Sequence, residues 1–140
     1  MRHQTNGLYI FFDIRTVTVY NVLKKETYWG EQLAKAEICA GVCGFNTKVE
    51  TQKGDSGQIH LTIESECEAI NRLAEELTEV DPYREFTYRG DGPLTFEAAA
   101  KHCSHAACPV PVGIIKAVEI EAGLALPQDV SIKLSKSDTE

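Results

Sequence analysis

The sequence predicts a small α+β domain, in which an antiparallel β-sheet packs against two to four helices. Two stretches with a period of two, at residues 38–50 and 58–64, predict a β-hairpin. An amphipathic helical pattern follows the hairpin directly, and further helical patterns follow nearer the C-terminus. The sheet is therefore expected to consist of this hairpin and a short extra strand.

The hairpin is predicted by alternation on both sides of a turn. The intervening sequence Gly-Asp-Ser-Gly at residues 54–57 is typical of a loop between paired strands. The residues that alternate are Phe45, Thr47 and Val49 before this turn and Ile59, Leu61 and Ile63 after it.

The first helix is predicted to start near Glu66. Ser65 is a favourable N-cap, and Glu68 three residues later completes a capping-box pattern. An apolar stripe then repeats at helical spacing through Ile70, Leu73, Ala74 and Leu77.

The remaining elements are marked by prolines and glycines. Asp81-Pro82 predicts a short helical turn, and residues 96–103 carry a helical apolar face. The prolines within residues 107–111 interrupt that helix, because proline disfavours a helical residue before it. A last helix is expected from near Val112 to the stop at Gly123, and Val130, Ile132 and Leu134 predict a final short strand. The residues expected in the core are Ile59, Leu61, Ile63, Ile70, Leu73, Leu77, Ile115 and Val118.

Size and charge restrict the function classes. A chain of 140 residues suffices for one core, and its net charge of -7 argues against a general nucleic-acid binder. No apolar run approaches the roughly 20 residues that span a bilayer, and no signal-peptide pattern is seen. We therefore expect a cytoplasmic protein that binds neither nucleic acid nor membrane.

The domain is expected to occupy residues 33–134, followed by a polar tail at 135–140. Residues 1–32 show no clear continuation of its pattern. One interpretation is an extension outside the native protein, because Trp29-Gly30-Glu31 must be encoded by a purine-rich run resembling a ribosome-binding site and Leu33 can be encoded by an alternative start codon. The other is a genuine extra strand or arm.

The five cysteines carry the distinctive chemistry of the chain. In a reducing cytosol, clustered cysteines more often bind metal or do redox work than form disulfides. Their positions are Cys39, Cys43, Cys67, Cys103 and Cys108. The chain has no Cys-x2-Cys pair, so no standard zinc finger is predicted.

Individual positions differ in how well they suit a ligand. Cys67 is expected near the N-terminus of the first helix, where free N–H groups favour an anionic thiolate, although Glu66 and Glu68 oppose this effect. Cys43 lies between two glycines that leave space beside its sulfur. Cys39 is equally consistent with a core residue. Each of these cysteines has the alternative of ordinary packing.

The richest segment lies between residues 101 and 109. His102, Cys103, His105 and Cys108 fall within seven residues, and sulfur and imidazole are the donors used by zinc and iron–sulfur centres. Antiparallel pairing of the hairpin returns Cys67 toward the end of the sheet where Cys43 begins. We therefore expect the sulfurs of Cys43, Cys67 and Cys108 to converge, with Cys103 and His102 as candidates for a fourth ligand.

The order of these parts resembles the NifU/IscU type of iron–sulfur scaffold domain. The matching pieces are Cys43-Gly44, the strand leading into Cys67-Glu68-Ala69-Ile70, His102-Cys103-Ser104, and the Ile114–Val118 segment of a helix. The likeness covers residues 36–122 by position and pattern. It departs where Cys67 lacks a following glycine and where Cys108-Pro109 has no counterpart, which leaves the choice of third ligand between Cys103 and Cys108 open. Residues 36–132 also resemble a small uncharacterised family from anaerobic prokaryotes.

The resemblance implies an intracellular module that binds an iron–sulfur cluster or another metal as a scaffold, carrier or sensor. It also implies a protein partner in metal or sulfur trafficking. One alternative is a structural zinc site in an interaction domain. The other is a thiol enzyme, with Cys67 as nucleophile and His102 or His105 as base.

Overall fold

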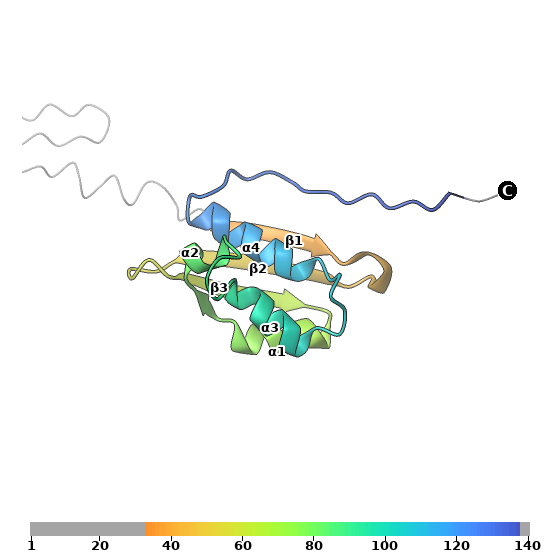
Figure 1. Cartoon of the computed structure of the whole chain (residues 1–140), viewed down its shortest axis with the longest axis horizontal. Helices are drawn as coiled ribbons and strands as arrows, with labels where there is room; N and C mark the ends of the chain where they lie inside the picture. Colours follow the sequence, from red (N-terminus) through yellow and green to blue (C-terminus); the bar gives the residue numbers. More distant parts are fainter. Residues whose placement is uncertain (1–32, 138–140) are drawn as a thin grey trace, which may run out of the picture. The chain divides into compact units, whose positions relative to one another are not determined.

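The computed structural model describes residues 33–137 of the chain, and it confirms the α+β class. A four-stranded antiparallel sheet in the order β1-β2-β3-β4 carries four helices (Figure 1). The strands are β1 (Ala34–Cys39), β2 (Asn46–Lys53), β3 (Ile59–Ser65) and β4 (Glu79–Val80). The helices are α1 (Glu68–Glu76), α2 (Pro82–Glu85), α3 (Leu94–His102) and α4 (Val110–Glu121). The predictions made for residues 1–32 lie outside the described residues.

The predicted hairpin is confirmed as β2 and β3. The strands pair antiparallel from Thr47 opposite Ser65 to Lys53 opposite Ile59, around the predicted turn at residues 54–57. Alternate residues of the sheet are buried under the helices, while those between them, such as Lys48 and Thr62, are exposed. The sheet therefore has one covered face and one face open to solvent.

The first strand region was predicted as one continuous element, and this is wrong. A 3-10 turn at Gly41–Cys43 divides it into β1 and β2. Gly41 and Gly44 take positive φ angles of 77° and 71°, which glycine adopts at little cost. Cys43 therefore lies on this turn, where it was expected to open a strand.

The predicted start of the first helix also needs correction. Ser65 is the last residue of β3, and its hydroxyl lies 2.7 Å from Thr47 Oγ1 across the ladder. The N-cap of α1 is Cys67, whose backbone N–H donates to Ser65 Oγ at 3.1 Å. The capping box does not form, because pairing with β2 keeps Ser65 in the sheet.

The predicted final strand is absent. Residues 124–137 form no helix or strand, and Val130, Ile132 and Leu134 are exposed. The extra strands of the sheet are instead β1 and β4, and β4 pairs its two residues with Ile59 and His60. A two-residue strand is too short to show a period in sequence.

Most of the predicted core is confirmed, since Ile59, Leu61, Ile70, Leu73 and the α1 C-cap Leu77 are buried. The two exceptions, Ile63 and Ile115, are half-buried. In α4 the neighbour of Ile115, Ile114, is fully buried and belongs to the core. The other buried apolar residues of this core are Val49, Val80, Ala98, Val110, Ala117 and Val118.

A buried carboxylate connects α2 to α3. Glu85, at the end of α2, is 1% exposed and accepts hydrogen bonds from the backbone N–H groups of Leu94 at 2.8 Å and Thr95 at 3.2 Å. These N–H groups lie in the first turn of α3, which has no side-chain cap of its own. Glu85 thus supplies partners that the helix terminus would otherwise lack. Within residues 33–137, no helix is long and apolar enough to cross a membrane.

Candidate functional site

Three chain connections meet at one end of the sheet. Cys39 pairs with Asn46 and Thr47 with Ser65, so the end of β1, the start of β2 and the end of β3 are adjacent. The first turn of α4 reaches the same end, because a Cβ atom added at Gly113 would lie 2.3 Å from Ile38 Cδ1. One region at this end of the sheet is therefore surrounded by the β1–β2 turn, the β3–α1 junction and the α3–α4 loop.

A pocket of about 430 Å³ lies between these connections. Residues from 40–47, 67–70 and 103–110 line it. Its walls carry four of the five cysteines, namely Cys43, Cys67, Cys103 and Cys108. The pocket thus brings together cysteines up to 65 positions apart in sequence, and Cys43, Cys67 and Cys108 are all among its lining residues.

Three of these thiols are partly buried in the wall of the pocket. Cys67, Cys103 and Cys108 pack against the hydrophobic core. Burial raises the pKa of the Cys103 thiol, and the neighbouring thiols of Cys108 and Cys67 raise it further. A side-chain hydrogen bond with Cys108 raises the pKa of Cys103 in the same direction.

The fourth thiol lies on the exposed side of the pocket. Cys43 ends the 3-10 turn, and its Sγ donates to the Ala40 carbonyl at 3.6 Å. Its neighbour Val42 is fully exposed, and Phe45 is 42% exposed. The site therefore has a buried side with three thiols and a solvent-facing turn that carries one more.

The structure places the other candidates outside this pocket or at its margin. His102 directs Nε2 to Glu76 Oε2 at 2.7 Å, and Lys101 pairs with the same carboxylate. Cys39 is exposed at the end of β1 and does not line the pocket. His105, considered from the sequence both as a donor and as a base, does line it. The sequence signal for this position is that His105 lies in the same loop as Cys103 and Cys108.

The donor types suit a soft metal, but their present arrangement is not a ligand cage. Among residues 33–137, no group of three or more His, Cys, Asp or Glu side chains is positioned to hold a metal ion. Thiolates are nevertheless the ligands preferred by zinc and by iron–sulfur clusters.

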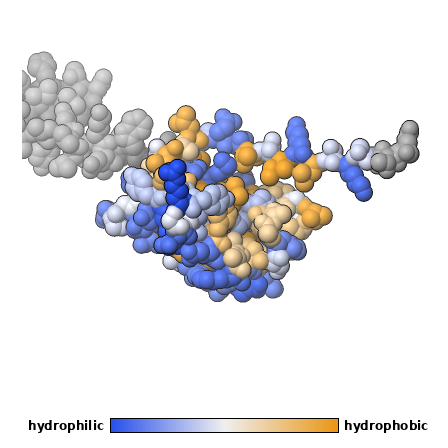
Figure 2. All heavy atoms as spheres, viewed as in Figure 1, coloured by the Kyte–Doolittle hydropathy of each residue, from blue (hydrophilic) through white to orange (hydrophobic). Residues whose placement is uncertain are grey.

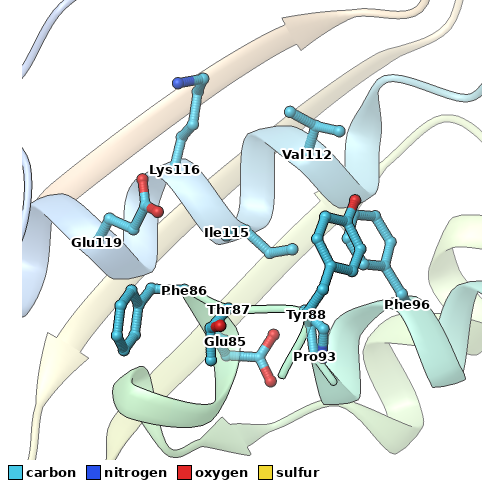
Figure 3. A pocket seen from close by; sticks show the side chains of 10 residues that line it. All are labelled: Glu85, Phe86, Thr87, Tyr88, Pro93, Phe96, Val112, Ile115, Lys116 and Glu119. Atoms are coloured by element: carbon cyan, nitrogen blue, oxygen red, sulfur yellow. The ribbon is translucent and has the colours of Figure 1, made fainter. Parts of the chain in front are cut away.

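A second, smaller pocket of about 220 Å³ lies between α4, the start of α3 and the loop after α2. Figure 3 shows Ile115 pointing into it beside the ring of Tyr88, which stacks on Phe96 with centroids 5.7 Å apart. Glu85 also lines this pocket, but both of its oxygens already accept backbone hydrogen bonds. No cysteine or histidine among the described residues lines it, so it offers aromatic surface without the thiol chemistry of the first pocket.

Comparison with known proteins identifies the family of this chain. The model of DUF6951, a family of unknown function, matches residues 34–134. The chain belongs to this family. The DUF6951 match includes every strand and helix of the described fold and all five cysteines. No curated protein and no solved structure matches the chain.

Proposed function

We propose that this protein binds a thiolate-ligated metal centre, an iron–sulfur cluster first of all, as a scaffold, carrier or sensor. The observation that carries the proposal is the gathering of Cys43, Cys67, Cys103 and Cys108 around one pocket. Four thiols from three separate segments give the number and type of donors that such centres use. The resemblance of the cysteine order to NifU/IscU scaffolds supports the same function.

The shape of the pocket favours a cluster over a single ion. A zinc ion holds its sulfur ligands at about 2.3 Å, so a structural zinc site needs little free volume. The pocket here is about 430 Å³, and apolar groups of Ile70, Val110 and Ala69 line part of it. A space of this size accommodates several metal and sulfide atoms, and apolar walls limit access of water to them.

The exposed position of Cys43 favours a transferable centre. Structural zinc sites are typically closed, with four protein ligands and no open position. Here one of the four thiols lies on a glycine-flanked turn at the surface. A ligand on such a turn can be released more easily than one within the core, as a scaffold or carrier requires.

The two helix ends at the pocket also favour negative charge. Cys67 is the N-cap of α1, and Cys108 directly precedes the N-cap of α4. The free backbone N–H groups and the positive dipole ends of these helices stabilise nearby anions. A thiolate-ligated cluster carries such a charge.

Anaerobic reconstitution with ferrous iron and sulfide tests the proposal. We expect a brown protein with visible absorption and stoichiometric iron and acid-labile sulfide. Zinc-loaded protein serves as the control, because zinc thiolates do not absorb in the visible. Stoichiometric zinc binding without any cluster formation would favour the structural zinc alternative, and failure to bind either would overturn the proposal.

Metal affinity is expected to fall as pH falls. Thiols must lose their protons to bind, and the raised pKa of Cys103 means that this proton is held at neutral pH. At pH values below the pKa of a ligand thiol, each proton released on binding makes the metal affinity increase about tenfold for every unit by which the pH is raised. Titration with cobalt(II), whose thiolate complexes absorb, at about pH 6, 7 and 8 measures the slope. The Cys103→Ser variant should have a shallower slope, and identical slopes would exclude Cys103 as a ligand.

A further inference from the structure

The C-terminal segment at residues 124–137, here called the arm, leaves its apolar side chains uncovered. Figure 1 shows it as an extended trace after α4, and Figure 2 shows hydrophobic atoms along it. Ile132 and Leu134 are 77% and 89% exposed. The other exposed large apolar residues of the arm are Leu124, Leu126 and Val130. Five such side chains in one short segment are typical of an interaction site.

The apolar part of the arm belongs to the family domain. The DUF6951 match continues past α4 and ends at residue 134, where the apolar alternation also ends. In an extended strand, Val130, Ile132 and Leu134 would lie on one face, and Ser131 and Lys133 on the other. This is the pattern of a strand that covers a core on one face.

The sheet offers an edge with the matching pattern. β1 is an edge strand that pairs with β2 and with no other described strand. On the helix side of β1, Ala36 and Ile38 are only partly buried, whereas Lys35 and Glu37 on the other side are exposed. An added strand would cover Ala36 and Ile38 and pair with the side of β1 that bonds no other strand of residues 33–137.

Both the alternation and the charges of the arm fit this edge. With Val130, Ile132 and Leu134 on the helix side, Lys133 falls on the same face as Glu37 and as Lys35, whose ammonium already pairs with Glu50. Opposite charges on neighbouring strands favour pairing. The N–H of Ala34 already donates to Glu121 Oε2 at 2.8 Å, so the added strand would pair with β1 beyond Ala34.

We propose that the arm of one chain adds to the β1 edge of a second copy of this chain. The chain's own arm starts close to its own β1, since Glu121 bonds Ala34, and it still remains exposed from Leu126 onward. A reciprocal exchange between two copies covers both arms and both edges in one closed two-fold dimer. This inference is independent of metal binding.

Sedimentation of the full, metal-free chain tests the proposal. Reducing agent is included because Cys39 and Cys43 are exposed and could form disulfides between copies. We expect a dimer at micromolar concentration. Ile132→Asp should raise the dimer dissociation constant by about 100-fold or more, because it places an unpaired charge in both copies of the buried strand. Ser131→Asp, which adds the same charge to the opposite face, is the matched control and should remain dimeric.

Charge reversal gives a second, specific readout. Lys133→Glu should weaken the dimer, and adding Glu37→Lys to the same chain should restore it. A dimer insensitive to Ile132→Asp uses another surface and overturns the proposal. A monomer overturns it as well, and hydrogen exchange then distinguishes an arm that closes on its own edge, with protected amides, from an arm that stays free.

Discussion

Replacing Leu73 with alanine is expected to lower the free energy of unfolding by about 2–5 kcal/mol. Leu73 is fully buried in α1, where it packs within the main core beside Ile70 and Leu77. The loss combines removal of apolar contacts with a cavity that the surrounding helices and sheet cannot fully close. Chemical denaturation of the metal-free protein, followed by circular dichroism, measures the change.

The matched control is Arg72→Ala on the exposed side of the same helix. Arg72 is exposed, so its replacement should change the free energy of unfolding by less than about 0.5 kcal/mol. Similar effects of the two substitutions would contradict the assignment of the buried face of α1. That face was predicted from the apolar spacing alone, so this comparison also tests the sequence interpretation.

Replacing a pocket cysteine with serine is expected to have the largest effect on metal binding. Cys67→Ser, Cys103→Ser and Cys108→Ser should each reduce metal affinity by at least about tenfold, since even partners of the ligands are worth 10–100-fold. Serine preserves the size of the side chain but is a much poorer ligand for soft metals. Metal and sulfide analysis after anaerobic reconstitution measures the loss.

Cys39→Ser is the matched control for this series. Cys39 is exposed at the end of β1 and does not line the pocket, so its loss should leave the bound metal unchanged. Cys43→Ser is expected to weaken binding, because Cys43 does line the pocket. Equal metal content in all five serine variants, each with an unchanged far-ultraviolet spectrum, would show that the cysteines are packing residues.

For His102, the position in the sequence and the position in the structure give different answers. Its position beside Cys103 made it a candidate ligand, but the end of α3 turns its ring toward Glu76 on α1. Lys101 pairs with the same carboxylate, and together they lower the pKa of Glu76. Adjacent residues of a helix point in different directions, so proximity in sequence does not place His102 and Cys103 in one site.

The sequence by itself determined the elements whose signals are local. Alternation around a Gly-Asp-Ser-Gly turn was enough for the β2–β3 hairpin, and apolar spacing was enough for the buried face of α1. The antiparallel hairpin also implied that Cys43 and Cys67 return to one end of the sheet. Local periodicity carries this information because burial on one face imposes it directly.

Only the tertiary structure decided those features for which local signals compete or depend on distant partners. Ser65 has the chemistry of an N-cap, but ladder pairing with Thr47 keeps it in β3. Val130, Ile132 and Leu134 have the period of a strand, yet a strand needs a neighbour, and none of the described strands pairs with them. The four pocket cysteines come from three segments, and packing of α4 on β1 and β2 determines that the last segment joins the others. Such contacts depend on how whole elements pack, which no single stretch of sequence encodes.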